Sequence, residues 1–275
     1  MSWYEFKKGK TSKRDVLEFE LALEDNLFKL HEELRKKTYQ HSNYTSFYIT
    51  DPKLRHIHKA KVRDRIVHHA VFRKLYPVFD KHFIYDSYSC RINKGTHRAV
   101  QRLEMFCRKL SENYRQRIYY LKCDIKKFFA SVDQDRLTQI IQKKINDEDT
   151  LWLLNQIISS FEEEKGKGIP LGNVTSQLFC NIYLNELDQF VKHEFKVRYY
   201  IRYCDDFVLL DEEADRLKLY IPRIEKFLAK RLKLILHPDK VITRKLKQGI
   251  DFLGYVVLPR HIVMRTKTKN GCLKS

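Results

Sequence analysis

The segment YYIRYCDDFVLL, residues 199–210, constrains the fold more than any other stretch of the chain. Two apolar arms flank a Cys-Asp-Asp centre, and this layout predicts a β-hairpin that carries carboxylates at its turn. Upstream, IYYLKCD (118–124) is a short β-type run that ends at Asp124. If these strands are neighbours in one sheet, the side chains of Asp124, Asp205 and Asp206 meet at one edge of it.

Three carboxylates at one place need a physical reason, because their charges repel one another. Divalent cations remove the repulsion, and hard oxygen ligands suit Mg²⁺, which keeps several waters and is completed by substrate phosphates. Two such ions about 3.5–4 Å apart can activate a 3′-hydroxyl group and stabilise a leaving pyrophosphate. The pattern therefore predicts nucleotidyl transfer. The alternative, that Asp205 and Asp206 are only turn formers, leaves the upstream Asp124 unexplained.

The hydrophobic pattern predicts the surrounding elements. Apolar residues at helical spacing predict helices over residues 16–34, 99–110, 137–145, 151–158, 178–191 and 217–228. Ser176 is expected to help cap the fifth of these helices. Alternating residues predict two further strands, LKLIL (232–236) and FLGYVVL (252–258). This order of elements indicates an α+β fold with helices on one face of the sheet.

The formal net charge of +19 predicts a polyanionic partner, and nucleic acid is the first candidate. The segment from Lys53 to Lys74 contains eight Lys or Arg and four His but only one acidic residue, Asp64. This excess of basic residues favours a phosphate-facing surface over a solvated helix face. No apolar run approaches the roughly 20 residues that span a bilayer, and no helix has the pattern of a membrane-surface helix. The start MSWYEFKKGK has no apolar signal core, so we expect a cytoplasmic protein.

Seven blocks of the sequence resemble, in order and spacing, those of a reverse transcriptase. Five are LKCDIKKFFASVD, GIPLGNVTSQ, RYCDDFVLL, LHPDK and GIDFLGY. The other two, KLRHIHKAKVRDRIVHHAV and DSYSCRINKGTHRA, resemble more specifically the enzymes of diversity-generating retroelements. The resemblance covers roughly residues 50–258. It implies a right-hand polymerase with fingers at 1–116, a palm with an antiparallel sheet at 117–258, and a thumb that is short or missing, with 259–275 as its remnant or start. The palm would include the 161–177 loop and the YCDD hairpin.

The resemblance also implies site residues. Asp124, Asp205 and Asp206 would be catalytic and, with the carbonyl group of Ile125, would hold two Mg²⁺ ions, which Mn²⁺ could replace. Lys53 and Arg55 match the basic pair that grips the incoming triphosphate, and Lys240 matches a position that protonates the leaving pyrophosphate. Phe129 matches the wall that excludes a ribose 2′-hydroxyl group, although it could instead be a core aromatic beside Phe128. Template or primer binding would fall to Arg63, Arg65, Arg91 and Tyr203. Arg63 and Arg65 could alternatively anchor Asp64 inside the protein.

The loop GIPLGNVTSQ departs from the commonest pattern of the family, in which Gln-Gly leads to Ser-Pro beneath the templating base and the incoming nucleotide. Leu171 and Gln177 replace the Gln and the Pro, a pattern that is typical of the retroelement enzymes that misincorporate opposite adenine. An aliphatic side chain can pack against the nascent pair but cannot hydrogen-bond to it. Gly172 would let the backbone approach the nucleotide closely, or it is a plain turn glycine.

The function that the resemblance implies is RNA-directed DNA polymerisation that copies a template-repeat RNA into cDNA with errors at adenine. Its partners would be template RNA, a DNA or RNA primer, deoxynucleoside triphosphates, and a basic helical accessory protein that forms an oligomeric barrel. A reverse transcriptase of group II intron or phage-defence type is one alternative. An alternative of another class is a basic RNA-binding protein whose catalytic centre is unused.

Overall fold

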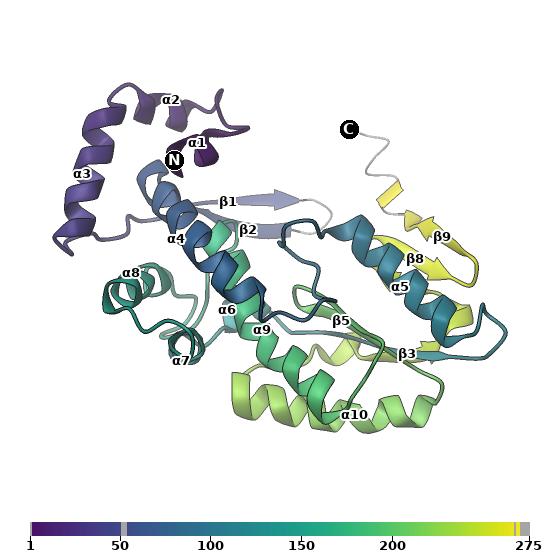
Figure 1. Ribbon diagram of the computed structural model, residues 1–275. Helices are drawn as coiled ribbons and strands as arrows, with labels where there is room; N and C mark the ends of the chain where they lie inside the picture. The colour runs from purple at the N-terminus through teal and green to yellow at the C-terminus, as the bar shows by residue number, and fades with distance from the viewer. Residues whose placement is uncertain (1, 51–53, 267, 270–275) are drawn as a thin grey trace. The chain divides into compact units, whose positions relative to one another are not determined.

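The computed structural model describes residues 2–50, 54–266 and 268–269, and the chain divides into two compact units (Figure 1). Unit 1 comprises Met1–His82 and Asp133–Phe179, and unit 2 comprises Phe83–Val132 and Cys180–Ser275. These units do not coincide with the ranges 1–116 and 117–258 that the sequence suggested, because 83–116 belongs to unit 2 and 133–179 to unit 1.

Unit 1 consists mainly of helices, with one β-hairpin in its described residues. Its elements are α1 (Ser2–Lys7), α2 (Arg14–Glu20), α3 (Leu23–Arg35), β1 (Thr45–Thr50), β2 (Leu54–Lys59), α4 (Val62–Asp80), α7 (Gln134–Gln142), α8 (Glu148–Ile158) and the first residues of α9 (Val174–Glu194). Helix α4 contacts α1, α2 and α3 and supplies much of the buried apolar surface. The side chains of Asp133 and Asp147 cap α7 and α8 by accepting hydrogen bonds from backbone N–H groups of the first turn.

Unit 2 is built around a four-stranded antiparallel sheet. Its elements are α5 (Thr96–Leu110), β3 (Tyr119–Asp124), α6 (Phe128–Ser131), the remainder of α9, β4 (Tyr200–Tyr203), β5 (Asp206–Asp211), α10 (Ala214–Phe227), β6 (Ile242–Lys245), β7 (Ile250–Phe252), β8 (Tyr255–Leu258), β9 (His261–Met264), a π-helical turn (Leu228–Leu232) and two 3₁₀ turns (Pro238–Lys240 and Leu246–Gln248). The strand order is β4-β5-β3-β6. The hairpin β4–β5 and the strand β3, both predicted from the sequence, are therefore neighbours.

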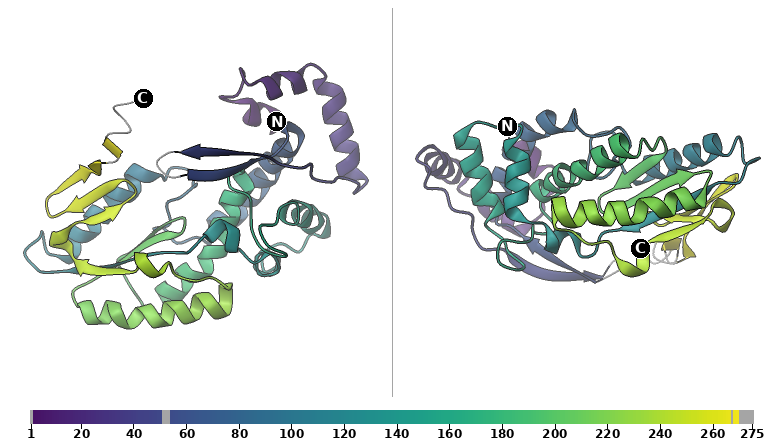
Figure 2. Two further views of the ribbon diagram at one scale, coloured as in Figure 1. Left: turned by 180° about the vertical axis from the view of Figure 1, so that it is seen from behind. Right: turned by 90° about the horizontal axis from the view of Figure 1, so that it is seen from below.

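Helices cover both faces of this sheet, so the prediction of helices on one face is wrong. Helix α5 packs against the face that carries Tyr120, Ile201 and Val208. Helix α10 lies along the opposite face (Figures 1 and 2). On that face the hydroxyl group of Tyr200 donates a hydrogen bond to Asp188 in α9 at 2.7 Å. Because both faces are covered, four of the six residues in each of β3 and β5 are apolar or aromatic.

The run FLGYVVL, predicted as one strand, contains a tight turn between two strands. Strands β7 and β8 pair on either side of Leu253 and Gly254, whose φ angles are 53° and 87°. A two-residue turn with positive φ at both positions matches the right-handed twist of a hairpin. Strand β9 pairs with β8 as a third strand. It lies in the range 259–275 that the sequence assigned to the remnant or start of a thumb.

The predicted strand LKLIL (232–236) is also wrong. Leu232 ends the π-helical turn that continues α10, and beyond it only Leu236 forms an isolated β-bridge. Burial nevertheless alternates, because Leu234 and Leu236 are buried while Ile235 is exposed. The strand that pairs with β3 on this side is β6, which lies further along the chain.

The predicted helix over residues 16–34 is two helices, α2 and α3, that run in different directions (Figure 1). Ala22, before the first residue of α3, has φ and ψ of −126° and 47°, outside the helical region. The amide group of Asn26 donates a hydrogen bond to the carbonyl of Phe19 at 3.0 Å, so the break leaves that carbonyl satisfied.

The remaining helix predictions hold, apart from one cap. Helices α5, α7, α8 and α10 confirm the predictions over 99–110, 137–145, 151–158 and 217–228, with shifts of a few residues at their ends. Helix α9 begins at Val174, so Ser176 is a buried residue of its first turn and does not precede it as a cap. Among the described helices, none combines the length and the apolar character that crossing a membrane requires.

Candidate active site

The three predicted catalytic carboxylates lie together at one edge of the sheet in unit 2. Asp124 is the last residue of β3 and Asp206 the first of β5, and the two are direct partners in the antiparallel register. Asp205 lies in the turn before β5, where its carbonyl accepts a hydrogen bond from the backbone N–H of Ile125 at 3.3 Å. The expected meeting of Asp124 with the hairpin is confirmed.

The carboxylate of Asp206 is half-buried, and its charge is only partly compensated by a neighbouring lysine. Burial raises the pKa of its carboxyl group to about 7. Lys122, whose Nζ is 3.2 Å from Oδ2, opposes this rise in pKa, while the charges of Asp124 and Asp205 add to it. The other oxygen, Oδ1, is buried and has no hydrogen-bond partner among the described residues. A buried carboxylate oxygen without a partner is costly, so the site favours the arrival of a cation.

A second lysine stands beside Asp124. Lys240 Nζ donates a hydrogen bond to Asp124 Oδ1 at 2.9 Å. The 3₁₀ turn that carries Lys240 is itself fixed to β3, because the backbone N–H of His237 donates to the Asp124 carbonyl at 2.8 Å. Burial, and then the charge of Asp124, raises the pKa of Asp205. The structure thus brings together the predicted carboxylates and the predicted Lys240.

The donor atoms of this site fit a divalent cation. Among the residues that the structure describes, no three His, Cys, Asp or Glu side chains enclose a metal position as they stand. Carboxylate oxygens are nevertheless the ligands that Mg²⁺ prefers, and the unpartnered Oδ1 of Asp206 is available to coordinate a metal ion. Asp124, Asp205, Asp206 and the carbonyl oxygen of Ile125 are the groups that would hold the ion.

A buried ion pair supports the turn that carries Asp205. The guanidinium group of Arg202 contacts both oxygens of Asp188, with Nε–Oδ1 at 2.8 Å and Nη2–Oδ2 at 2.6 Å. Its Nη1 donates to the carbonyl of Cys204 at 3.0 Å, directly before Asp205. Sequence analysis missed this positioning role, because an arginine in a strand carries no signal that it is fully buried.

Lys122 was missed as well, although the sequence held a signal for it. Side chains two residues apart in a strand point to the same face, so Lys122 shares a face with Asp124. The register places Val208 opposite Lys122, one alternate position along from Asp206. The period of the strand therefore places an ammonium group beside the carboxylates.

The GIPLGNVTSQ loop lies in unit 1, against strand β2. The carbonyl of Leu171 accepts a hydrogen bond from the backbone N–H of His58 at 3.0 Å, and the amide group of Asn173 donates to the His58 carbonyl at 3.2 Å. Between them, Gly172 has a φ of 116°, and a Cβ atom there would lie 3.0 Å from Ile57 Cγ2. Glycine is therefore required at 172 by the turn and by the close approach to β2.

The start of α9 is tied to helix α4. Thr175 Oγ1 is 2.5 Å from His68 Nδ1, and His68 Nε2 is 2.9 Å from Nε2 of His41. His68 is fully buried, and burial lowers its pKa to about 3, which keeps the ring neutral. Residues 171–175 are thus fixed to both β2 and α4. Sequence analysis missed His58, Asn173 and His68, because isolated polar residues carry no periodic signal.

The other predicted nucleotide-binding residues have different surroundings. Arg55 and Gln177 are exposed, on β2 and α9 respectively. Lys53 lies outside the described residues. In unit 2, Phe129 is half-buried, and its ring meets that of the buried Phe128 edge-on with centroids 5.4 Å apart. Phe129 is therefore the ring of this pair that a ligand can contact.

Two of the predicted template-binding arginines have acidic partners within unit 1. Arg63 forms an ion pair with Glu33, and its Nε is 3.6 Å from Oδ1 of the fully buried Asp64. Arg65 forms an ion pair with Asp15. The contact of Arg63 favours the anchoring of Asp64 that the sequence left open, whereas the ion pair of Arg65 is with Asp15 instead.

The remaining two, Arg91 and Tyr203, lie in unit 2. Arg91 Nη1 donates hydrogen bonds to the carbonyls of Ile84 and Ser87 at 2.7 and 3.0 Å, so it stabilises the loop before α5. Tyr203, at the end of β4, accepts a hydrogen bond from the hydroxyl group of Thr96 at 3.3 Å. A role of either residue in binding template or primer stays a prediction.

The chain is similar to known proteins over most of its length. A family model described as reverse transcriptase (RNA-dependent DNA polymerase) matches residues 35–257. Protein YkfC of Escherichia coli (strain K12) is 26% identical over an alignment that covers 94% of this chain and 76% of that protein. The putative COX1/OXI3 intron 2 protein of Saccharomyces cerevisiae is 22% identical, over 71% of this chain and 29% of that protein. Group II intron-encoded protein LtrA of Lactococcus lactis subsp. cremoris is 25% identical, over 61% of this chain and 28% of that protein.

Solved structures of telomerase from Candida tropicalis share the fold. An apo form truncated from the C-terminal domain aligns with a TM-score of 0.58 at 14% identity, over 87% of this chain and 59% of that chain. Another apo structure aligns with a TM-score of 0.59 at 15% identity, over 82% of this chain and 49% of that chain. The chain thus spans about half the length of these telomerases. It has the α+β right-hand polymerase fold with antiparallel sheets that the sequence predicted.

Proposed function

Because the chain belongs to the reverse transcriptase family, whose model matches residues 35–257, we propose that it polymerises DNA on an RNA template. The observation that carries this proposal is the pairing of Asp124 with Asp206 across two strands, with Asp205 in the adjoining turn. Divalent cations, which this family uses, would when bound activate the primer 3′-hydroxyl group and stabilise the leaving pyrophosphate. The three carboxylates and the Ile125 carbonyl would hold two Mg²⁺ ions, or Mn²⁺ in their place.

The neighbouring side chains would prepare the substrates. Lys122 fixes the Asp206 carboxylate by its contact at 3.2 Å. Lys240, whose Nζ is 2.9 Å from Asp124 Oδ1, would donate a proton to the leaving pyrophosphate. Arg55 would contact the triphosphate with its exposed guanidinium group, and Phe129 would exclude the ribose 2′-hydroxyl group. In this proposal residues 1–116 act as fingers, 117–258 as a palm and 259–275 as the start of a thumb.

The finer proposal is mutagenic copying of a template-repeat RNA, with errors at adenine, as in diversity-generating retroelements. Leu171 and Gln177 support it, because they stand where the commoner form of the loop has Gln and Pro. The backbone of Leu171 is held by His58, so the side chain at 171 can vary without moving the loop. A basic helical accessory protein in the form of an oligomeric barrel would be the partner, together with template RNA, a DNA or RNA primer and deoxynucleoside triphosphates.

A second candidate is a reverse transcriptase that serves a group II intron. The observation in its favour is the identity of 25% to the intron-encoded protein of Lactococcus lactis. In that case the chain would copy RNA without a bias in errors at adenine.

One experiment separates these proposals. Primer extension on a defined RNA template, followed by sequencing of the cDNA, is expected to give Mg²⁺-dependent product with errors concentrated opposite adenine. The matched control is Asp124→Asn, which should give no product. If the parent and the control are equally inactive with Mg²⁺ and with Mn²⁺, the polymerase proposal fails and a basic RNA-binding protein remains. Product with errors spread evenly over the four bases would favour the intron-type enzyme.

A further inference from the structure

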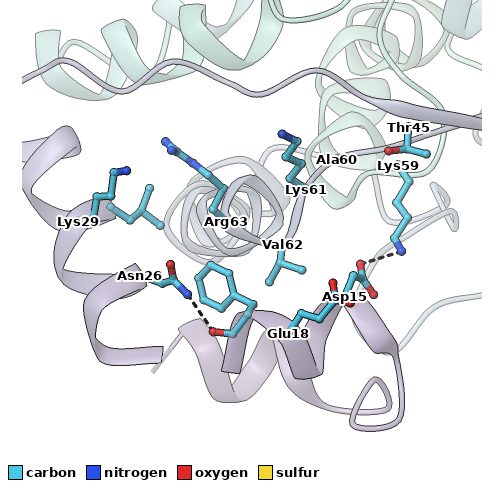
Figure 3. A pocket seen from close by; sticks show the side chains of 12 residues that line it. Asp15, Glu18, Asn26, Lys29, Thr45, Lys59, Ala60, Lys61, Val62 and Arg63 are labelled. Carbon is cyan, nitrogen blue, oxygen red and sulfur yellow. Dashed lines mark hydrogen bonds and ion pairs between the residues drawn. The ribbon is translucent and has the colours of Figure 1, made fainter. Parts of the chain in front are cut away.

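A cavity of about 530 Å³ lies within unit 1, where helices α2 and α3 face the junction of β2 with α4 (Figure 3). Among the residues with a role predicted from the sequence, Arg63 alone lines it. The catalytic carboxylates are not part of its wall. The size of the cavity is in the range of small-molecule and nucleotide sites.

Positive charge exceeds negative charge in the wall of this cavity. Four cationic side chains line it, together with two acidic ones from α2: Lys29, Lys59, Lys61, Arg63, Asp15 and Glu18. Lys59 Nζ is 2.7 Å from Asp15 Oδ2, and Arg63 is paired with Glu33. Lys29 and Lys61 form no ion pair within the part of the chain that the structure describes.

Figure 3 shows how these charges are distributed. Lys29, Arg63 and Lys61 lie along one rim of the cavity, and Asp15 and Glu18 lie along the other. Glu18 accepts a hydrogen bond from Arg14 Nε at 2.8 Å, so part of its charge is already compensated. An anionic group is therefore attracted to the lysine rim, where two ammonium groups are unpaired.

Apolar side chains line the cavity between these rims. Phe19, Leu30 and Val62 belong to its wall. The ring of Phe19 stacks on that of the buried Trp3, with centroids 5.5 Å apart and planes at 29°, so its orientation is held from behind. A fixed aromatic ring beside free cations is the combination on which single-stranded nucleic acids bind, because bases stack on the ring while phosphates meet the charges.

We infer that this cavity binds single-stranded RNA, with backbone phosphates at Lys29 and at Lys61 and a base against Phe19. The inference rests on the proposed function, since it takes RNA to be the polymer that this chain handles. The position of the cavity argues against the incoming deoxynucleotide as the occupant. Arg55 and Lys59 are four residues apart on β2, which separates the predicted triphosphate contact from the cavity by roughly 13 Å.

The test is a double charge reversal, Lys29→Glu with Lys61→Glu, compared with a matched control that changes charge equally elsewhere. Lys226→Glu with Lys230→Glu provides that control, because both lysines are exposed on the surface of unit 2. Equilibrium binding of a single-stranded RNA without nucleotides is measured over a salt series. Binding of free dATP to the same proteins is measured in parallel.

The expected result is a loss of RNA affinity of at least about tenfold at low salt in the cavity variant, with a log–log salt slope reduced by about 0.7 for each phosphate that the variant no longer binds. The control should keep the parent slope. Equal losses in both variants would overturn the inference, because the effect would then be one of total charge. Loss of dATP binding with unchanged RNA affinity would also overturn it, since the occupant would be a free nucleotide.

Phe19→Leu provides a second measurement that does not alter charge. It keeps an apolar side chain against Trp3 but removes the ring, so RNA affinity should fall about fivefold or more while the salt slope stays unchanged. An unchanged affinity would exclude base stacking at Phe19. Failure of the proposed function is distinguishable from failure of the cavity. If the parent binds RNA through Lys29 and Lys61 but extends no primer, only the polymerase proposal fails. If the parent extends primers and the cavity variant keeps full RNA affinity, only the inference about the cavity fails.

Discussion

Acid should destabilise unit 1 through one histidine. His68 is a fully buried residue of α4 that contacts the start of α9, with Thr175 Oγ1 2.5 Å from its Nδ1 and His41 Nε2 2.9 Å from its Nε2. Burial, with the neighbouring rings of His41 and His69 acting in the same direction, lowers its pKa to about 3. The unfolded chain has an ordinary histidine pKa near 6.5, so it binds a proton at a pH where the folded protein does not.

The sign and the magnitude follow from this difference. The stability that the neutral His68 contributes is complete above pH 6.5 and is lost as the pH falls towards the folded pKa, because protonation then favours the unfolded chain. Each unit of pH below 6.5 costs about 1.4 kcal/mol, so His68 by itself should lower the free energy of unfolding by about 2 kcal/mol between pH 7.5 and pH 5.

Urea unfolding at a series of pH values tests this expectation. In His68→Gln the amide can still hydrogen-bond to Thr175 but cannot titrate, so this variant should lose about 2 kcal/mol less than the parent between pH 7.5 and pH 5. The matched control is His31→Gln, since His31 is exposed on α3 and should keep the pH dependence of the parent. The reasoning is refuted if the parent and His68→Gln lose the same stability over this range.

Four further substitutions test the site and the loop. Asp206→Asn should abolish primer extension yet raise the metal-free stability at pH 8 by about 2–4 kcal/mol, because the parent must ionise a carboxyl group whose pKa burial raises to about 7. The gain should vanish as the pH falls towards 4, and a less stable variant at pH 8 would contradict this account. Phe129→Ala should admit ribonucleotides, which primer extension with ribonucleoside triphosphates measures; unchanged sugar selection would place the gate elsewhere. Leu171→Gln should lower errors opposite adenine relative to the other template bases, and sequencing of cDNA from one RNA would show an unaltered ratio if this residue does not set fidelity. Asn173→Ala should lower the free energy of unfolding by about 1 kcal/mol, since the donor to the His58 carbonyl is removed. If the hydrogen bond between Asn173 and His58 positions β2 for substrate binding, the KM for deoxynucleotides should also increase. An unchanged KM would show that this hydrogen bond does not position β2.

The elements that the sequence predicted correctly are those whose pattern is local. Helices α5 and α8 carry an apolar stripe at helical spacing, and β3 with the hairpin β4–β5 shows short apolar runs that end at acidic residues. Such patterns depend on the period of one element and on its own burial, so they can be read without knowing its neighbours. The meeting of the three aspartates at one sheet edge depended in addition on β3 and β5 being neighbours, which the pattern of each strand does not show.

Two of the wrong predictions, for residues 232–236 and 252–258, rest on an apolar pattern as evidence of one strand. Residues 232–236 alternate between buried and exposed positions, yet the chain there has no partner strand beyond one bridge. Burial alternates in any extended segment that lies on a core, whereas a strand also needs a neighbour for its hydrogen bonds. In FLGYVVL the positive φ angles at Leu253 and Gly254 form the turn that divides the run into two strands. Leucine rarely adopts a positive φ angle, so the sequence did not predict this turn.

The fold class, the acidic residues at the strand ends and the positive charge of the chain follow from the sequence, because they depend on the identity and the period of residues. Tertiary structure alone decided what surrounds them. It set Lys240 against Asp124, buried Arg202 behind the Asp205 turn, and tied Asn173 to His58. The contacts of Lys240 and Asn173 each join residues more than 100 positions apart through one hydrogen bond. A single polar residue has no periodic pattern that could show its partner before the chain is folded.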